Sequence, residues 1–184
     1  MKVVWVVRPA EGGILHHLRQ LLVGLQDWEI AVAAPPELKD LLPARRFLDL
    51  ELVDGFHPTQ DFAAVRKLRR LLKQENARIV HAHGLKAALV TAAALAARRR
   101  PHFLFTAHNS LPQSPTKLFG WASNMVQRWL FGGMTTIISV SDAVRAQLVR
   151  YVPENKVLTI YNGICSSGFG LCRAEVTRSA LNLF

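Results

Sequence analysis

Cysteine is scarce in this chain. Only Cys165 and Cys172 occur among 184 residues, and both lie near the carboxyl end. Their spacing matches neither a C-x-x-C redox pair nor a zinc knuckle. The sequence therefore argues against a disulfide framework, a thioredoxin-like redox centre and a structural zinc site. We interpret both cysteines as free thiols.

The sequence also lacks a long apolar run. The longest stretch, residues 85–97, is too short to cross a bilayer and contains Lys86 near its start. A secretory signal is not evident either, because the apolar residues 3–7 are followed by Arg8 and Pro9 and not by a small-residue cleavage site. These absences predict a chain without a transmembrane helix and a cytoplasmic protein.

Acidic residues are few, with 13 Asp and Glu against 23 Lys and Arg, so the formal net charge is +10. Such an excess favours a polyanionic partner, which could be nucleic acid, an anionic membrane surface or a phosphorylated small molecule. Composition does not choose among these three. The basic residues gather at two places: Arg66, Lys67, Arg69, Arg70 and Lys73, and again Arg98, Arg99 and Arg100.

Strand-like and helix-like segments alternate along the chain, and half of the residues are hydrophobic. Strands are predicted at residues 3–7, 30–34, 47–52, 78–81, 103–107, 134–140 and 157–160. Helices are predicted at residues 14–26, 37–42, 58–73, 85–97, 114–131 and 142–150, with Thr59 and Ser141 as caps and with Phe62, Val65, Leu68 and Leu72 on an inner face. The order predicts a doubly wound, mostly parallel Rossmann-like α/β sheet of six or seven strands with helices on both faces.

Ligands of open parallel sheets bind beyond the carboxyl ends of the strands. The loops expected there contain Gly12-Gly13, then His83-Gly84, then His108-Asn109, and then Ser141. Gly12 and Gly13 would let the backbone approach a phosphate, or they form an ordinary tight turn. No G-x-G-x-x-G fingerprint is present, which argues against a nicotinamide dehydrogenase.

Several histidines fall at this expected edge: His16, His17, His81, His83 and His108. A metal site is disfavoured because no H-E-x-x-H occurs and no carboxylate accompanies the strand-end histidines. His81 fits a structural place within the sheet equally well. His83 and His108 are the better functional candidates, as hydrogen-bonding groups for phosphate or sugar hydroxyls or as an acid or base.

Aromatic residues gather in residues 114–131, where Trp121 and Trp129 accompany Lys117 and Arg128. The segment is either a core helix or an interfacial surface that contacts anionic lipids. The basic residues 66–73 admit the membrane interpretation too, although a row of charges is usually a solvated helix face. Nucleic-acid binding is the weaker alternative, because no RNA-binding signature accompanies the aromatic and basic residues.

Five short motifs, in order along residues 1–164, resemble the N-terminal domain of the family 4 glycosyltransferases, which have the GT-B fold. They are Gly12-Gly13 with His17, R-I-V-H-A-H-G at residues 78–84, F-T-A-H-N at residues 105–109, I-I-S-V-S at residues 137–141 and V-L-T-I-Y-N-G-I at residues 157–164.

The resemblance implies transfer of a sugar, with retention, from a nucleotide-sugar to an acceptor. By this match, Gly12 and Gly13 approach the donor diphosphate and the acceptor, and His108 lies near the reacting sugar. Residues implied to line the same cleft are His17, His83, Thr106, Asn109 and Ser141. The nucleotide-sugar is a co-substrate, and no metal or other cofactor is implied. Several family members act at the cytoplasmic membrane on lipid-linked acceptors, which favours the interfacial interpretation and the inner face of that membrane.

The chain departs from the family after residue 164. Cys165 stands where the family usually has Asp, and residues 165–184 match nothing recognisable in place of a second, donor-binding domain. Little or no transfer is therefore expected from the chain alone. This ending fits an isolated domain, a truncated or frameshifted gene, or one half of a split enzyme. A truncated or frameshifted gene is slightly favoured. The alternative function is a non-catalytic, membrane-associated scaffold that binds an acceptor and recruits a donor-binding chain.

Overall fold

A computed structural model describes residues 2–96, 101–111 and 117–163 of the chain, with side chains from residue 124 onward in the last range. The strands are β1 (Lys2–Val7), β2 (Glu29–Ala34), β3 (Arg46–Asp49), β4 (Ile79–His83), β5 (His102–Ala107), β6 (Thr136–Ser139) and β7 (Val157–Thr159). The helices are α1 (Gly12–Gly24), α2 (Pro58–Glu75), α3 (Leu85–Leu95), α4 (Lys117–Gly132) and α5 (Asp142–Leu148), with 3₁₀ turns η1 (Pro36–Leu38) and η2 (Glu154–Lys156).

The strands form one seven-stranded sheet in the order β3-β2-β1-β4-β5-β6-β7, and every neighbouring pair is parallel. This confirms the predicted Rossmann-like α/β fold. β1 lies at the centre because its continuous run of valines and Trp5 suits a strand that is buried on both faces. The chain order reverses between β1 and β4, and this topological switch point is where ligands of doubly wound sheets bind.

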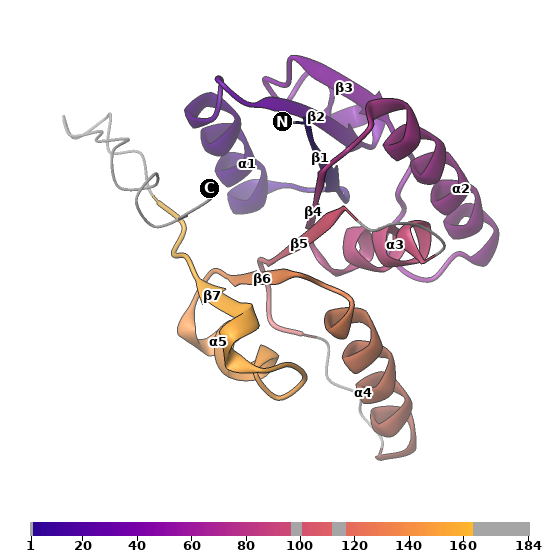
Figure 1. Cartoon of the computed structure of the whole chain (residues 1–184), viewed down its shortest axis with the longest axis vertical. Coiled ribbons are helices and arrows are strands. Elements are labelled where there is room, and N and C mark those ends of the chain that lie inside the picture. Colours follow the sequence, from indigo (N-terminus) through magenta and orange to yellow (C-terminus); the bar gives the residue numbers. More distant parts are fainter. Residues whose placement is uncertain (1, 97–100, 112–116, 164–184) are drawn as a thin grey trace.

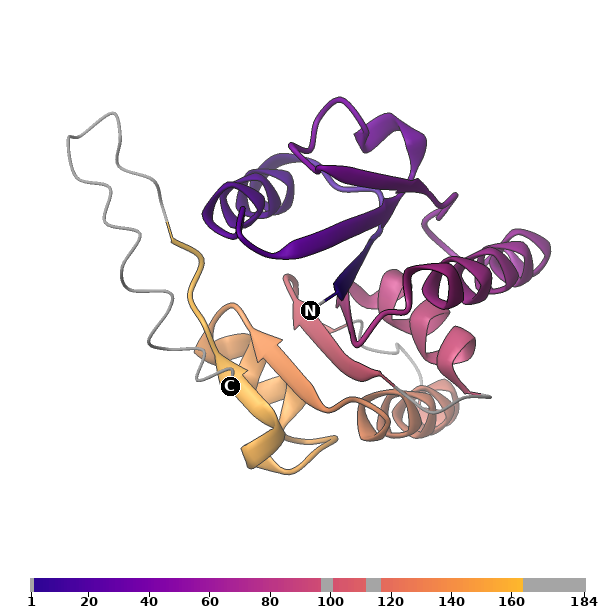
Figure 2. The same ribbon diagram turned by 45° about the horizontal axis from the view of Figure 1, so that its top comes forward.

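Helices cover both faces of the sheet, and alternate residues of β1 serve two separate cores. Val3, Trp5 and Val7 pack with Leu18 and Leu22 of α1 on one face. On the other face, the core of Val4 and Val6 includes buried residues of α2, α3, α4 and α5. Figures 1 and 2 show α1 on one side of the sheet and α2, α3 and α4 on the other.

The inner face of α2 differs from the predicted one. Phe62 is 64% exposed, whereas Ala64 and Glu75 are buried together with Leu68 and Leu72. These four residues form one stripe at helical spacing, and Phe62 lies outside that stripe. The buried Glu75 carboxylate is bonded by Arg46, whose Nη2 lies 2.7 Å from Oε1. Expecting Phe62 on the inner face was wrong.

The two predicted helix caps have different outcomes. Ser141 caps α5, since its Oγ accepts a hydrogen bond from the Val144 amide at 3.3 Å. Thr59 is not a cap, because α2 begins at Pro58 and His57 occupies the cap position. Proline suits the first helical position, because a backbone N–H at that position would have no hydrogen-bond partner within the helix.

Most element boundaries agree with the predictions to within a few residues. The helix expected at residues 37–42 is only the 3₁₀ turn η1. Some predictions lie outside the described residues: the arginines at 98–100, the start of the 114–131 segment, the side chain of Trp121, both cysteines and the 165–184 tail. Among the described residues, no helix is both long enough and apolar enough to span a bilayer.

Candidate functional site

Three imidazoles meet at the carboxyl edge of the sheet on the face covered by α1. His83 ends β4, His108 follows β5, and His17 extends from α1. The His83 and His108 rings are stacked with centroids 5.5 Å apart, and the His17 ring meets His108 edge-on at 5.5 Å. The structure therefore brings together residues that lie far apart in the sequence. We call these three residues the histidine cluster.

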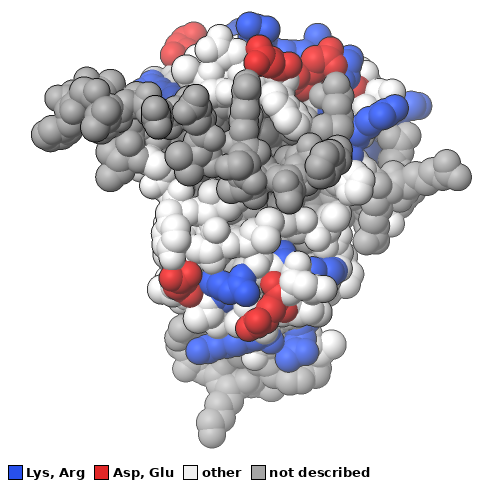
Figure 3. All heavy atoms as spheres, turned by 60° about the vertical axis from the view of Figure 1, so that its left-hand side comes forward, with Lys and Arg blue, Asp and Glu red and all other residues white. Residues whose placement is uncertain are grey.

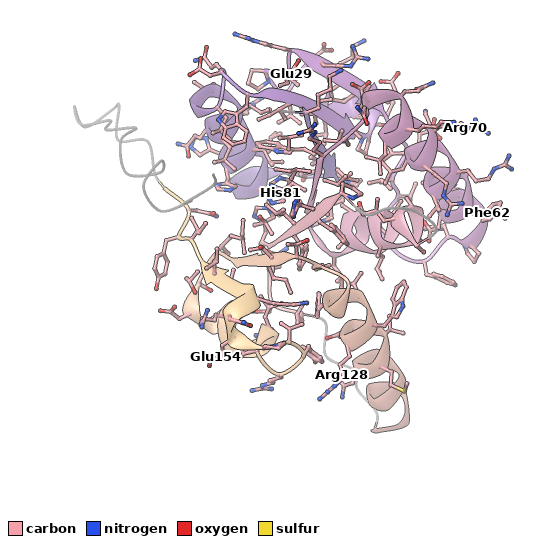
Figure 4. All side chains as sticks on the ribbon, in the orientation of Figure 1. Glu29, Phe62, Arg70, His81, Arg128 and Glu154 are labelled. Carbon is pink, nitrogen blue, oxygen red and sulfur yellow. The ribbon has the colours of Figure 1, made fainter. Side chains whose placement is uncertain are left out.

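A layer of buried side chains supports the cluster from within the sheet. His81 lies two residues before His83 on the same face of β4, and the two rings are 4.0 Å apart. The ring of Trp5 on β1 contacts His83 at 4.9 Å and His81 at 6.0 Å. His81 Nε2 is 2.8 Å from the hydroxyl of Thr106, which is also buried. Figure 4 shows His81 in the middle of the molecule, where its side chain is buried.

Burial keeps these imidazoles neutral. Desolvation lowers the pKa of His81 to about 3 and that of His108 to about 4, and it holds the pKa of His83 well below its usual value. Neighbouring histidines lower each of these pKa values further, and Arg8 also lowers that of His108. The pKa of His17 is lowered as well, first by desolvation and then by His16. At neutral pH the cluster therefore offers N–H donors and lone pairs without positive charge.

One hydrogen bond joins the cluster internally, between His83 Nδ1 and His108 Nε2 at 3.3 Å. One of these nitrogens must carry the proton, so the tautomers of the two rings are coupled. Within the described part of the chain, His83 Nε2 and His108 Nδ1 are buried without a hydrogen-bond partner. A buried polar atom without a partner costs about 1–3 kcal/mol, which a ligand group bonded to it would recover.

No metal centre is formed by these side chains. In residues 2–96, 101–111 and 117–163, no group of three or more His, Cys, Asp or Glu side chains is arranged to hold a metal ion. The Trp5 ring meets His81 edge-on and His83 at a tilt. Neutral ring nitrogens, which donate or accept hydrogen bonds, suit contacts with hydroxyl or phosphate groups.

Gly12 and Gly13 form the first turn of α1 and are exposed. Gly12 has φ +55°, a backbone conformation that favours glycine. A Cβ atom at either position would meet nothing within 4 Å, so packing requires neither glycine. Both therefore present bare backbone to open space at the start of a helix, where a ligand with negative charge is favoured.

The remaining predicted site residues lie at the same edge but outside the histidine cluster. Asn109 is exposed next to His108, and Ser141 is partly buried and uses its hydroxyl to cap α5. Thr106 is buried beneath the cluster and connects to it through His81. The ring contacts that unite the cluster do not extend to Asn109 or Ser141 among the described residues.

Arg8 also lies at this edge of the sheet, although its sequence context did not single it out as a candidate. It follows β1 directly, and its Nη1 donates to both carboxylate oxygens of Asp54, at 3.2 and 2.9 Å. Its side chain lies against Gly84, where a Cβ atom would come within 2.8 Å of Arg8 Cδ and 2.9 Å of Nε. Gly84 also has φ +90°. Like His108, Arg8 directly follows a strand, and ligands of doubly wound sheets bind beyond the strand ends. Its position after β1 is the sequence signal that could have identified it.

A second ion pair holds the same loop in place. Lys86 Nζ is 2.6 Å from Asp61 Oδ1 and donates to the Gly55 carbonyl oxygen at 2.6 Å. The loop between β3 and α2, which contains Asp54 and Gly55, is thereby fixed against the start of α3. This loop and α3 border the switch point on the face opposite α1.

A protein family described as Glycosyltransferase Family 4 matches residues 11–167. Solved structures of similar fold include a glycosyltransferase from Rickettsia africae, at TM-score 0.66 and 17% identity, with 92% of this chain and 45% of that one covered. The Anabaena protein HepE, in complex with UDP and glucose, matches at TM-score 0.67 and 20% identity, with 89% and 45% covered. The UDP-GlcNAc 2-epimerase of Neisseria meningitidis, bound to UDP-GlcNAc, matches at TM-score 0.61 and 13% identity, with 86% and 45% covered.

The chain thus spans less than half the length of each of these structures. At such identities the likeness shows the fold alone, and transferases and epimerases share it. No curated protein sequence matches the chain.

Proposed function

The chain belongs to glycosyltransferase family 4, and we propose that it forms the acceptor-side half of an enzyme that transfers a sugar from a nucleotide-sugar to an acceptor with retention of configuration. The observation that carries the proposal is the neutral histidine cluster at the carboxyl edge of the sheet, within the residues that match the family. A nucleotide-sugar donor is supported by HepE, whose structure contains UDP and glucose.

His108 is assigned to the reacting sugar. Its pKa of about 4 makes it a weak base at neutral pH, so its part is to hold a hydroxyl group through a neutral ring nitrogen. His83 fixes the orientation of that ring through their shared hydrogen bond, and the His17 ring contacts it edge-on. Gly12 and Gly13 present backbone to the donor diphosphate, while Asn109 and Ser141 border the acceptor.

A second domain is required in this proposal. Sugar transfer needs fixed positive groups around the leaving diphosphate, and the first turn of α1 supplies only part of that stabilisation. The missing groups would belong to a donor-binding domain, either in the same polypeptide or in a partner chain. Without it the chain would act as the acceptor-binding scaffold.

The test joins residues 1–163 to the carboxyl-terminal half of HepE and compares this chimera with the full chain alone. Each protein is incubated with radiolabelled UDP-glucose and a panel of sugar and lipid-linked acceptors, and product configuration is read by NMR. We expect the chimera to form α-linked product and the chain alone to form none. Transfer by the chain alone would contradict the need for a second domain. If HepE is active and its chimera is not, the proposed function is wrong.

We propose further that α2 and α4 bring this domain to an anionic membrane leaflet, the inner face of the cytoplasmic membrane. The predicted basic residues of α2, Arg66, Lys67, Arg69, Arg70 and Lys73, are all exposed. Phe62 is exposed on α2 with the Arg66 guanidinium 5.9 Å from its ring centroid. Figure 4 shows Phe62 and Arg70 pointing away from the sheet.

The α4 helix adds apolar side chains on the same side of the sheet. Met125, Val126 and Trp129 are each more than half exposed. Exposed aromatic and aliphatic residues beside a row of cations suit insertion into a headgroup region. The side of the molecule shown in Figure 3 differs, because blue and red side chains lie close together there. A membrane partner is therefore favoured at the α2–α4 layer.

Replacing Arg70 and Lys73 by glutamine should weaken binding to vesicles of phosphatidylglycerol and phosphatidylcholine about thirtyfold, since each basic residue near such a surface contributes about 1 kcal/mol. Co-sedimentation of the full chain measures this. Arg69 is left intact because its guanidinium donates to the Ala93 and Ala94 carbonyl oxygens at the end of α3.

The matched control replaces Lys39 and Arg150, two exposed cations outside α2 and α4, by glutamine. We expect this variant to bind vesicles as the unmodified chain does. An equal loss of vesicle binding in both variants would show that binding depends on the net charge of the chain and not on α2. Tight binding to single-stranded oligonucleotides without vesicle binding would favour nucleic acid instead.

A further inference from the structure

Arg8 lies at the switch point of the sheet, and part of its guanidinium group makes no hydrogen bond to the described residues. We propose that Arg8 binds an oxyanion of the acceptor, a phosphate or a carboxylate, and that Asp54 and Gly84 position its guanidinium for this contact. The identification of the ligand as the acceptor rests on the proposed function. The oxyanion site itself rests on the geometry of Arg8.

Arg8 uses only part of its guanidinium group for hydrogen bonds to the described residues. Both hydrogen bonds to Asp54 come from Nη1. Nε and Nη2 make no hydrogen bond to the described residues, although the side chain is only 23% exposed. The Nε and Nη2 edge of a guanidinium is the fork that binds two oxygens of a carboxylate or phosphate at once. Arg8 therefore has a partner that orients it and an edge left for a ligand.

The side chain of Arg8 packs closely against Gly84. The Cδ and Nε atoms of Arg8 occupy the space where a side chain at residue 84 would begin. The absence of that side chain lets the guanidinium lie beside the start of α3. The first turn of α3 contains no acidic residue and no side-chain cap, so its dipole adds to the attraction for an anion.

Positive and negative side chains are paired around Arg8. Lys86 is paired with Asp61, and Arg8 is paired with Asp54, so charges of both signs are already matched near the edge. The imidazoles that follow or end the neighbouring strands are neutral. His83, directly before Gly84, keeps Nε2 buried without a partner in the described residues. A polar ligand group at this place would therefore meet donors and no excess negative charge.

The oxyanion bound by Arg8 and the donor diphosphate would lie at different places on the sheet. Gly12 and Gly13 begin α1 on one face of the sheet, whereas the groups around Arg8 come from α3 and the β3–α2 loop on the other. The histidine cluster lies on the α1 face. An acceptor anchored at Arg8 would thus extend across the switch point toward His108.

The test titrates the ¹⁵N-labelled full chain with inorganic phosphate, and in parallel with acetate, while the Arg8 Nε–H signal and the amides of Gly84 and Lys86 are followed by NMR. We expect saturable shifts at these signals. Arg8→Gln should weaken phosphate binding about tenfold or more, because charged hydrogen bonds are lost. Arg8→Lys keeps the charge but not the fork, and it should weaken binding to a lesser extent. Arg66→Gln, an exposed arginine of α2, is the matched control and should bind as the unmodified chain does.

Gly84→Ala tests the position of the Arg8 guanidinium and not its charge. The added Cβ atom would displace the Arg8 side chain, while every ionisable group remains. The substitution should weaken phosphate binding as strongly as Arg8→Gln. If this variant does not fold, the two Arg8 variants decide alone. Unchanged binding in Arg8→Gln would overturn the site. Competition between UDP and phosphate at the same signals would overturn its assignment to the acceptor. None of these readings requires sugar transfer, so they stand even if the chimera is inactive.

Discussion

His108→Ala in the chimera is expected to lower turnover by about 10²–10³-fold, while the free energy of unfolding falls by only about 1–2 kcal/mol. The large kinetic effect follows if the neutral ring holds a hydroxyl group of the reacting sugar. The small effect on stability follows from the contacts of the ring. His108 is only partly buried and makes one hydrogen bond, to His83, and its Nδ1 has no partner among the described residues.

The same strand provides a matched control for this substitution. His102 begins β5 at the opposite edge of the sheet and is exposed. His102→Ala should leave turnover and stability nearly unchanged. Turnover is measured by product formation under saturating UDP-glucose, and stability by urea unfolding of both variants. If His108→Ala lost stability and activity in proportion, or if His102→Ala lost as much activity, His108 would be a structural residue.

His108→Gln refines the assignment, because glutamine retains a donor and an acceptor but cannot carry an imidazole proton. Partial recovery of turnover relative to His108→Ala would indicate that hydrogen bonding is the main contribution. This outcome is expected from the pKa of about 4, which leaves little of the ring protonated at neutral pH. A turnover as low as that of the alanine variant would instead favour proton transfer.

Much of this site was predictable because it depends on local patterns. A buried strand pattern followed by polar residues predicts which residues reach the carboxyl edge, and this reasoning selected His83, His108 and Gly12. The same reasoning placed His17 at this edge, and the family resemblance made it a candidate site residue. The structure then supplied the distances and the burial, on which the neutral state of the rings depends.

The parts that escaped prediction depend on contacts between distant residues. Arg8 and Asp54 are 46 positions apart, and no sequence spacing indicates that pair. The fit of Arg8 against Gly84 needs the adjacency of β1 and β4, which only the sheet order provides. Phe62 was misplaced for a different reason. Apolar residues on neighbouring stripes of one helix do not reveal which stripe faces the core.

Acidification from pH 7 to pH 5 is expected to destabilise the chain strongly. The folded-state pKa values of His81, about 3, and His108, about 4, lie below the value of about 6.5 for an unfolded histidine, and that of His83 is also well below it. Between these limits the unfolded chain binds more protons, so stability is fully present above about pH 6.5 and falls as the pH decreases. Each histidine contributes a slope of about 1.4 kcal/mol per pH unit.

His81 and His108 together give about 4 kcal/mol at pH 5, and His83 adds to this in the same direction. This is a large part of the whole stability of about 5–15 kcal/mol of a typical domain. Urea unfolding at pH 5, 6, 7 and 8 measures the slope. His108→Gln should reduce the slope, because it removes one of the imidazoles whose pKa is lowered by burial. A flat profile between pH 5 and pH 7 would mean that the rings are hydrated, and the neutral state assigned to His108 in the transfer reaction would lose its basis.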